Sequence, residues 1–271
     1  MRRLEGQVAW ISGAGRGIGA GAAKLLSEEG AAVVVADIDP SSGRDTVEQI
    51  TANGHQAIFV QCDVTRSNDV QESVQAAVRE FGGLHILVNN AGIVDVGMLH
   101  QVEEKQWTLV MDTNVKSVYL SLKHAFPHLE RNERSYIVNV GSISSFVAQD
   151  RTPIYTTTKG AILQLTRSIA VDYARYGIRC NCICPGITDT PLLRHHIESL
   201  HDPEKHLARR LLRVPLNKIL TPGDIAKSIL YFSCEDSAGI TGTSLAIDGG
   251  YLAAAEWDAS NHSTSPRNPE K

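Results

Sequence analysis

Two short segments of the chain place a tyrosine four residues before a lysine, a spacing that could support proton transfer. They are YLSLK, from Tyr119 to Lys123, and YTTTK, from Tyr155 to Lys159. Residues four apart lie on the same face of a helix, so each phenol would stand beside an ammonium group. A phenol in such surroundings can act as a general acid or base. The spacing alone does not show which pair could be reactive, so the neighbouring sequence has to distinguish between them.

The first pair lies within an apolar helical pattern. In VKSVYLSLKHAF the residues that recur at helical spacing are Val115, Val118, Tyr119, Leu122 and Phe126. A tyrosine in such a stripe is typical of a structural residue on a helix that packs against a core. We therefore expect Tyr119 to have a structural role.

The second pair stands at a predicted helix start. Thr152 would supply a capping hydroxyl, and Pro153 would occupy the first helical position. Tyr155 and Lys159 would then lie in the first two turns. The preceding apolar run, SYIVNVGS, would end with Ser142 on the same side of the sheet. The sequence therefore favours Tyr155 as the reactive tyrosine.

A glycine-rich turn, SGAGRGIG at 12–19, follows the first apolar run, and the second run ends in Asp37. Glycine lets the backbone approach a pyrophosphate, and the amino end of the next helix favours its negative charge. The Asp37 carboxylate could accept hydrogen bonds from the adenosine ribose and would repel a 2′-phosphate. This favours NAD over NADP, although Arg16 could contact such a phosphate. The alternative is a plain tight turn and a strand-ending carboxylate.

These residues require strands and helices that alternate along the chain. Apolar runs rich in valine and isoleucine are typical of strands buried on both faces of a parallel sheet, joined by right-handed crossovers. The expected strands are 7–12, 31–37, 56–63, 84–90, 135–142 and 178–186. Polar residues at 62–64 and 89–92 would then gather at the carboxyl edge, where a dinucleotide binds. Turn formation by asparagine and glycine is the alternative.

The composition fits one globular domain and disfavours several other classes. Of 271 residues 42% are hydrophobic and 21% charged, and the net charge of −4 gives no basic stripe for nucleic acid. No apolar run reaches the ~18 residues of a membrane span, and the first apolar stretch is too short for a signal peptide. We expect a cytoplasmic protein with one domain over 1–251 and a polar, mobile tail at 252–271.

Five cysteines in an untargeted chain are typical of free thiols. The segment IRCNCICPG contains three of them at alternate positions. On a strand these side chains would point to one side, and the apolar flanks predict that the strand is buried. We expect the cysteines to be small buried hydrophobes, with a metal cluster as the less favoured alternative and no metal site elsewhere.

Taken together, these motifs resemble those of the classical short-chain dehydrogenases/reductases from about Leu4 to Tyr251. The matching segments are SGAGRGIG, Asp37, Asp63-Val64, NNAG at 89–92, Asn114, Ser142, YTTTK, PGITDTP at 185–191 and ITGTSLAIDGG at 240–250. The resemblance implies an α/β fold: one Rossmann-type doubly wound domain with a seven-stranded parallel sheet and a small helical substrate lid at about 188–220. Ser12 stands where the family usually has threonine and keeps the hydroxyl.

The resemblance also implies roles for individual residues. Tyr155 would be the general acid/base, and Ser142 would bind the substrate oxygen. Lys159 would hold the nicotinamide ribose and keep the phenol acidic, since positive neighbours favour a phenolate. Asn114 would support a water that links Lys159 to solvent. The residues implied in NAD binding are Gly13, Gly15, Arg16, Gly17, Ile18, Gly19, Asp37, Asp63, Val64, Asn90, Ala91, Gly92, Tyr155, Lys159, Pro185, Gly186, Ile187 and Thr190.

The substrate region is less specific. Ser144, Gln149 and Leu192 are candidate substrate contacts, and the polar segment 149–151 would suit a sugar or a diol. The lid is basic and could attract an anion, although a solvated face or a subunit contact is the favoured interpretation. Its basic residues are Arg194, His195, His196, Lys205, His206, Arg209, Arg210 and Arg213. The lid also looks similar to those of some hydroxysteroid and fucose dehydrogenases.

The resulting hypothesis is an NAD-dependent enzyme that interconverts a secondary alcohol and its ketone, with a small molecule as its partner. The alternatives are an NADPH-dependent reductase, such as a 3-ketoacyl-carrier-protein reductase, and a non-catalytic dinucleotide-sensing protein. The family resemblance implies a homotetramer built through helices at 104–131 and 155–176 and the last strand. The apolar residues expected to contribute are Val115, Val118, Leu122, Leu163, Ile169 and Tyr173.

Overall fold

Seven parallel strands form one sheet in the computed structural model, which describes residues 2–198 and 202–254. The strand order is β3-β2-β1-β4-β5-β6-β7, so the order reverses beside β1. Such a reversal opens a crevice at the carboxyl edge of the sheet. The predicted seven-stranded parallel sheet is confirmed. The strands are β1 Val8–Ser12, β2 Ala32–Asp37, β3 Ala57–Gln61, β4 Ile86–Asn89, β5 Ser135–Val140, β6 Ile178–Pro185 and β7 Ser244–Ile247.

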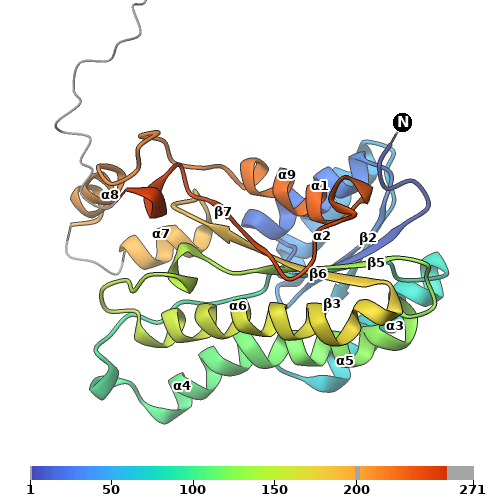
Figure 1. The fold of residues 1–271 in the computed structure, drawn as a ribbon, viewed down its shortest axis with the longest axis horizontal. Coiled ribbons are helices and arrows are strands. Elements are labelled where there is room, and N and C mark those ends of the chain that lie inside the picture. Colours follow the sequence, from blue (N-terminus) through green and yellow to red (C-terminus); the bar gives the residue numbers. More distant parts are fainter. Residues whose placement is uncertain (1, 199–201, 255–271) are drawn as a thin grey trace, which may run out of the picture.

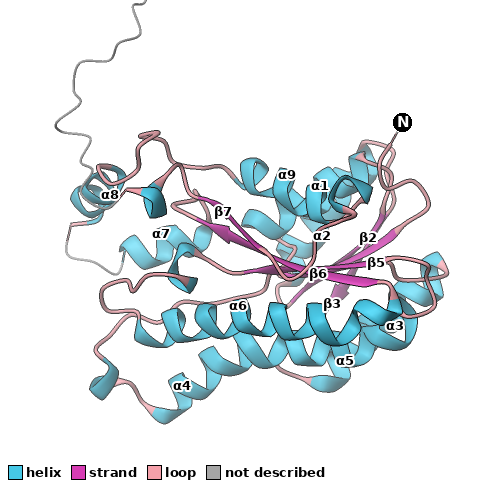
Figure 2. Ribbon diagram, viewed as in Figure 1, coloured by secondary structure: helices cyan, strands magenta, loops and turns pink. Residues whose placement is uncertain are grey.

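Helices cover both faces of the sheet (Figures 1 and 2). One face carries α1 Gly17–Glu28, α2 Pro40–Ala52 and α9 Pro222–Phe232. The other face carries α3 Ser67–Phe81, α5 Ser117–Leu129 and α6 Pro153–Tyr173. The remaining helical segments are α4 Glu104–Met111, α7 Pro191–Glu198, α8 Pro203–Leu211, η1 Leu99–Gln101, η2 Asp112–Lys116, η3 Ile143–Ser145, η4 Ala174–Tyr176, η5 Glu235–Ser237 and η6 Tyr251–Ala253.

The apolar core has two halves because successive side chains of a strand point to opposite faces. In β1, Trp10 joins the cluster beneath α3, α5 and α6, while Ile11 joins the cluster beneath α1 and α9. Burial on both faces explains the continuous apolar runs. The expectation is wrong for the run at 56–63, because β3 lies at the edge of the sheet, is only half-buried and ends in an exposed Gln61.

The cysteine-rich segment forms β6, as predicted. Cys180, Cys182 and Cys184 all point into the core half beneath α6, and each is fully buried. The sulfur atoms of Cys182 and Cys184 lie 3.7 Å apart. These cysteines are therefore part of the apolar core, which was the favoured interpretation.

A helical stretch expected at 104–131 contains an irregularity. Its middle, Asp112–Lys116, has the wider π-helical turn between α4 and α5. Asn114 lies within this turn and is buried. A π-helical turn inside an α-helix shifts the register of the side chains that follow and often marks a functional position.

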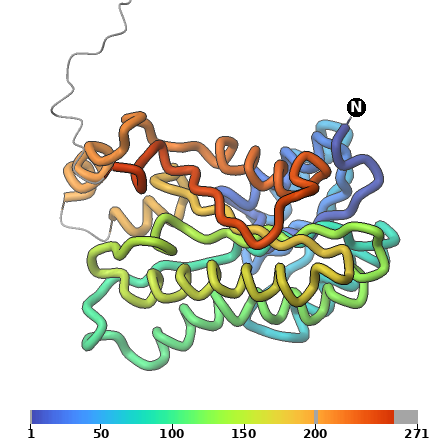
Figure 3. Tube along the Cα trace, in the orientation of Figure 1, coloured from blue at the N-terminus to red at the C-terminus, as the bar shows by residue number. Residues whose placement is uncertain are grey.

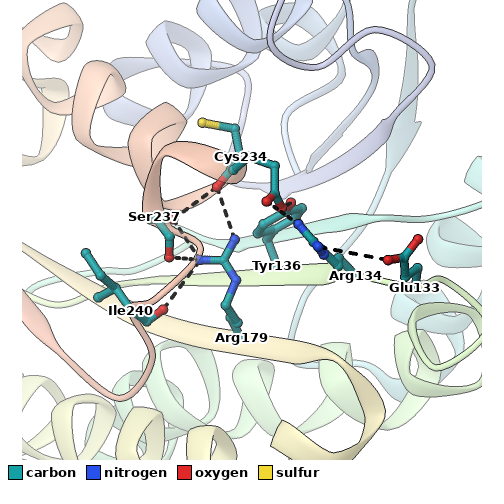
Figure 4. A network of polar contacts seen from close by, with 8 residues as sticks. Glu133, Arg134, Tyr136, Arg179, Cys234, Ser237 and Ile240 are labelled. Atoms are coloured by element: carbon teal, nitrogen blue, oxygen red, sulfur yellow. Dashed lines mark hydrogen bonds and ion pairs between the residues drawn. The ribbon is translucent and has the colours of Figure 1, made fainter.

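A polar network fixes the amino ends of β5 and β6 (Figure 4). The Arg179 guanidinium donates to the hydroxyl and carbonyl of Ser237 and, at 3.1 Å, to the Cys234 carbonyl. The central carbon of this guanidinium, Arg179 Cζ, lies 4.5 Å from the centre of the Tyr136 ring. The Tyr136 hydroxyl donates to Glu235, which also pairs with Arg134. The network ties the segment after α9 to the sheet, at the edge opposite the crevice.

The lid leaves and rejoins the framework at one point. Thr188 and Leu220 form an isolated parallel bridge, with Asp189 donating to the Leu220 carbonyl at 2.8 Å and Leu220 donating to the Ile187 carbonyl at 2.9 Å. Of the expected tail at 252–271, residues 252–253 belong to η6, and 255–271 lie outside the described residues. Within the described chain no helix has the length and apolar character to cross a membrane.

Candidate active site

The glycine turn lies between β1 and α1 and depends on glycine at four positions. Gly13 and Gly17 have φ of 61° and 59°, in the left-handed region that other residues avoid. A Cβ on Gly15 would stand 2.9 Å from an oxygen of Asp37, and a Cβ on Gly19 would collide with the Gly13 carbonyl oxygen. No side chain of the described residues caps the amino end of α1. The turn therefore presents close backbone and uncapped N–H groups to the crevice.

Asp37 ends β2 directly beside this turn. Its carboxylate is buried, and one oxygen accepts a hydrogen bond from the Gly15 amide at 2.7 Å. The other oxygen accepts one from the Asp39 amide at 3.0 Å. Arg16, in contrast, is exposed. The sequence did not indicate Thr46, whose hydroxyl donates to the Gly15 carbonyl at 3.0 Å and holds the turn from α2.

The segment at 89–92 supports the turn from the neighbouring strand. The Asn90 side-chain amide donates to the carbonyls of Ser12 and Gly13 at 2.9 and 3.0 Å. The Ser12 hydroxyl accepts hydrogen bonds from the amides of Asn90 and Ala91 at 3.0 and 3.1 Å. The hydroxyl that serine shares with threonine is therefore in use at this position. Asp63 and Val64 follow the edge strand β3, and Asp63 accepts hydrogen bonds from both the amide and the hydroxyl of Thr65.

Asn114 joins three segments of the site. Its side chain exchanges two hydrogen bonds with the backbone of Ile93, at 2.8 and 2.9 Å, and donates to the Thr158 hydroxyl at 3.0 Å. A Cβ on Gly92 would stand 3.4 Å from Asn114 Oδ1 and 3.7 Å from Lys159 Nζ. The predicted proximity of Asn114 and Lys159 is therefore present. Thr158 is a contact that the sequence did not indicate.

Tyr155 and Lys159 lie in the first two turns of α6, as predicted. The Lys159 Nζ atom stands 5.5 Å from the centre of the Tyr155 ring and donates to the Val140 carbonyl at 2.8 Å. Burial lowers the pKa of Lys159 to about 8. Burial also raises the pKa of the Tyr155 phenol, and hydrogen bonding with Ser142 opposes part of this rise. The sequence predicts a Tyr155 phenol with a lowered pKa. In the protein alone the pKa is raised instead, because desolvation of the phenolate outweighs the effects that favour it.

Ser142 links the end of β5 to α6. Its hydroxyl accepts a hydrogen bond from the Ser144 amide at 3.1 Å and caps η3. Its own amide donates to the Ser145 hydroxyl, which in turn donates to the Lys159 carbonyl at 2.8 Å. Ser145 was not predicted, although the serine cluster SISS after a buried strand was the available signal. The connection fixes Ser142 relative to both residues of the Tyr155–Lys159 pair.

Two expectations about neighbouring residues are wrong. Thr152 does precede α6, with Pro153 at its first turn, but its hydroxyl donates to the Gln149 carbonyl at 3.2 Å and does not cap the helix. Tyr119 is not part of a buried stripe, since 55% of it is exposed. The Tyr119 ring lies 5.8 Å from Lys123 Nζ, so the two tyrosine–lysine pairs share their spacing and differ in burial.

The segment after β6 closes the remaining side of the crevice. Pro185 and Ile187 are buried, and a Cβ on Gly186 would stand 2.7 Å from the Cα atom of Asp248. Thr190 lies against the glycine turn, 3.5 Å from where a Cβ on Gly17 would be. The structure therefore brings the predicted cofactor residues of the glycine turn and of this segment together.

The predicted substrate residues lie on the same side of the molecule. Ser144 is buried, and its hydroxyl has no hydrogen-bond partner among the described residues. Gln149 precedes α6, and Leu192 lies in the first turn of α7; both are half-buried. Figure 3 shows the lid, in orange, at the same end of the sheet as the start of α6. Within the lid, Arg194 forms a two-bond ion pair with Asp189, and Arg210 donates to His196 at 2.7 Å.

Comparisons with known proteins match nearly the whole chain. A family model described as enoyl-(acyl carrier protein) reductase matches residues 13–252. The chain is similar to cis-4-hydroxycyclohexanecarboxylate dehydrogenase of Sinomonas cyclohexanicum, with 38% identity over 91% of this chain and 97% of that protein. It is also similar to 2-(R)-hydroxypropyl-CoM dehydrogenase of Xanthobacter autotrophicus, with 34% identity over 91% of this chain and 99% of that protein.

The fold is also similar to solved structures. The ligand-free aldohexose dehydrogenase of Thermoplasma acidophilum superimposes with a TM-score of 0.84 and 30% identity, over 98% of this chain and 99% of that chain. Agreement in sequence and in fold therefore extends over the glycine turn, the Tyr155–Lys159 pair and the lid alike.

Proposed function

Because the chain belongs to the classical short-chain dehydrogenase/reductase family, we propose that it is an NAD-dependent enzyme that interconverts a secondary alcohol and its ketone. The observation that carries the proposal is the arrangement of Tyr155, Lys159 and Ser142 at the carboxyl edge of the sheet. The Ser145 hydroxyl connects two of them, because it accepts from the Ser142 amide and donates to the Lys159 carbonyl. The same edge holds the glycine turn and Asp37.

The residues present fit a dinucleotide cofactor, which members of this family bind. The turn can pack this closely because Gly15 and Gly19 lack a Cβ, and the amino end of α1 leaves its N–H groups without a side-chain cap. The turn would hold the pyrophosphate, and Asp37 would accept hydrogen bonds from the adenosine ribose. Lys159 and the segment 185–190 would hold the nicotinamide end. When bound, NAD supplies the acceptor for the hydride.

The proton chemistry belongs to Tyr155. In alcohol oxidation its phenolate oxygen would take the proton of the substrate hydroxyl, and in reduction the phenol would return it. The Ser142 hydroxyl would donate a hydrogen bond to the same substrate oxygen as negative charge develops on it. The positive charge of Lys159 would favour the phenolate and offset the burial that raises the pKa of Tyr155. Asn114 would keep the Lys159 side of the site in place through its bonds to Ile93 and Thr158.

The substrate class that the relatives support is a secondary alcohol on a small carbon skeleton. One similar protein is named for a hydroxycyclohexanecarboxylate, another for 2-(R)-hydroxypropyl-CoM and a third for an aldohexose. The first two names share a hydroxyl-bearing carbon. We propose that the same group reacts here, with NAD preferred over NADP because of Asp37.

The decisive experiment is a screen of secondary alcohols, sugars and hydroxy acids with NAD, followed by the absorbance of NADH. Wild-type protein should oxidise at least one member. Tyr155→Phe should lose turnover while still binding NADH, because the phenyl ring keeps the packing and lacks the proton. Tyr119→Phe is the matched control, and it should retain full activity since that phenol is exposed. A dead Tyr119→Phe beside an active Tyr155→Phe would refute the assignment.

A further inference from the structure

Two arginines stand out from the other described arginines because they are not exposed: Arg179 and Arg210. A charged group is costly to bury unless its donors find acceptors. Arg179 meets this need with the oxygen atoms of Cys234 and Ser237 (Figure 4). It lies at the amino edge, away from the crevice. Arg210 lies in the lid, and its surroundings are different.

Arg210 lacks an anionic partner in the described part of the chain. A guanidinium has five N–H donors, and among the described residues the one hydrogen bond from Arg210 runs from Nη2 to His196 Nε2, at 2.7 Å. Arg194, another arginine of the lid, is ion-paired and binds Asp189 through two hydrogen bonds. Arg210 therefore retains donors in the fork arrangement that matches a carboxylate or sulfonate.

The field around Arg210 is positive. The groups that shift the pKa of His196 after burial itself are Arg210, His195 and His206, and all of them lower it, to about 4. His196 is therefore neutral at neutral pH and serves Arg210 as an acceptor. Burial lowers the pKa of Arg210 as well, and the one group that opposes this is the phenol of Tyr251. An anion placed here would be attracted by the Arg210 guanidinium, whose charge no ion pair among the described residues offsets.

Arg210 lies within electrostatic reach of Tyr251, whose amide donates to the Asp248 carbonyl, and Asp248 lies against Gly186 in the segment at 185–190. His196 lies in α7, which begins beside Thr190 and the glycine turn. His196 lies six positions after Thr190, which corresponds to a rise of about 9 Å along the helix. Arg213, on the segment that follows α8, stacks over Tyr251 at 5.3 Å and extends the positive surface.

We propose that Arg210 is the receptor for a carboxylate or sulfonate on the substrate, held in place by His196, so that the enzyme selects hydroxy acids over neutral alcohols. The inference rests on the proposed function, since it names the substrate class of that same site. It assigns the basic lid a binding role, in place of the solvated face that the sequence favoured. Arg210 acts on substrate binding, while the hydride and proton steps stay with the residues of the crevice.

The test compares matched substrates and matched variants. The probes are secondary hydroxy acids from 3-hydroxybutyrate to 4-hydroxycyclohexanecarboxylate, a hydroxyalkanesulfonate, and the methyl ester or amide of each acid. Wild-type kcat/KM should favour the acids by about 10-fold to 100-fold, as expected for hydrogen bonds to a charged group. Arg210→Gln should remove most of this preference through KM and leave turnover of the neutral analogues intact. Arg210→Lys keeps the charge and loses the forked arrangement of donors. Its preference for acids should therefore lie between those of the wild type and Arg210→Gln.

Arg209→Gln is the control, because Arg209 is exposed on the same helix and its loss changes the lid charge equally. It should retain the preference for acids. Equal losses in both variants would assign the effect to the diffuse field and overturn the role of Arg210. Oxidation of neutral analogues as readily as acids by the wild type would overturn the inference and leave the proposed function standing. Oxidation of no probe would remove both. Arg210→Lys serves as the test variant if Arg210→Gln does not fold.

Discussion

The carboxylate of Asp37 accepts hydrogen bonds from two backbone amides, those of Gly15 and Asp39, and is buried while doing so. Its charge is therefore fixed in position beside the glycine turn and is not free to swing into solvent. A fixed negative charge discriminates more sharply between ligands than a mobile one, because rearrangement cannot relieve the repulsion. This residue consequently carries the expected preference between the two nicotinamide cofactors.

Asp37→Ser should weaken the use of NAD and improve the use of NADP together. Unit charges ~4 Å apart repel by about 4 kcal/mol at an effective dielectric near 20. Screening reduces this, so we expect 10-fold to 100-fold discrimination, or about 1.4–2.8 kcal/mol. The measurement is the ratio of kcat/KM values with the two cofactors on one substrate. Asp39→Ser is the control, because this carboxylate caps α2 and serine can replace it there. A wild type that prefers NADP would contradict the assignment.

The buried charge of Lys159 lowers the free energy of unfolding by an amount that can be measured. Burial lowers its pKa from 10.5 to about 8, so the unfolded chain binds more protons between these pH values. The free energy of unfolding should therefore rise with pH across that window, and below it the buried charge is a constant penalty. Lys159→Met removes the charge and keeps the length of the side chain. It should be inactive, yet more stable at pH 7 by about 1–3 kcal/mol.

Urea unfolding of the wild type and of Lys159→Met at pH 7 and pH 10 tests this. The difference in unfolding free energy between the two proteins isolates the effect of Lys159 from that of other groups that titrate in this range. This difference in unfolding free energy should be smaller at pH 10 than at pH 7. A variant that is less stable than the wild type at pH 7 would show that the bond from Lys159 to the Val140 carbonyl outweighs the desolvation.

The candidate reactive residues could be proposed from the sequence because several independent signals met at them. Tyr155 and Lys159 combined a spacing with a proline-marked helix start and a polar strand end. Thr46, Ser145 and Thr158 could not be located, since short hydroxyl side chains are common and their partners are backbone groups far away in the chain. Arg210 was indicated only as one of eight basic lid residues, because burial and pairing depend on tertiary contacts.

At the scale of elements, the strands and most helices followed from periodicity, whereas local irregularities did not. The π-helical turn that carries Asn114 has the same apolar spacing as an ordinary helix, so no sequence pattern marked it. The missing cap at Thr152 has a similar cause: the side chain fits a cap, but the Gln149 carbonyl competes for its hydroxyl. Edge position made β3 less buried than its composition indicated.

The connection from β1 to α1 should be far less tolerant of a methyl group than an ordinary helix. A Cβ on Gly19 would collide with backbone, the carbonyl oxygen of Gly13. Gly19→Ala should therefore destabilise the protein by about 1–3 kcal/mol and weaken NADH binding. Gly160→Ala is the comparison: it lies within α6 with no atom near the added methyl group, and should stabilise by about 0.5–1 kcal/mol. Thermal unfolding and NADH titration of both variants measure this, and a fully stable Gly19→Ala would contradict the geometry.

At the scale of the whole molecule, the apolar residues expected to form a subunit interface are mostly used within the chain. Val118, Leu122, Leu163 and Ile169 are buried in the core half beneath α5 and α6. The sequence pattern could not distinguish a face that meets the sheet from one that meets another subunit, since both are apolar. Other side chains on these helices are exposed instead: Leu109, Tyr119 and Val171, at 48%, 55% and 78%.

We propose that this exposed set, on α4, α5 and α6, contributes to a tetramer interface. Light scattering at micromolar concentration should give the mass of a tetramer for the wild type. Val171→Lys should shift the distribution towards smaller species, because an interface would have to bury an unpaired ammonium. Lys227→Arg, a conservative change on α9 on the opposite face of the sheet, should leave the mass unchanged. A wild type that remains monomeric at this concentration would exclude the proposed assembly.

The single bridge between Thr188 and Leu220 also bears on how such proteins diverge. The chain between these residues can lengthen, shorten or change its charge while the hydrogen bonds of the sheet stay the same. Mutations in the lid beyond Thr190 would leave the catalytic framework in place, so selection could change one without disturbing the other. Recombination between relatives at these two positions would exchange a complete lid. A descendant could then acquire a new substrate specificity while keeping the reaction of its parent.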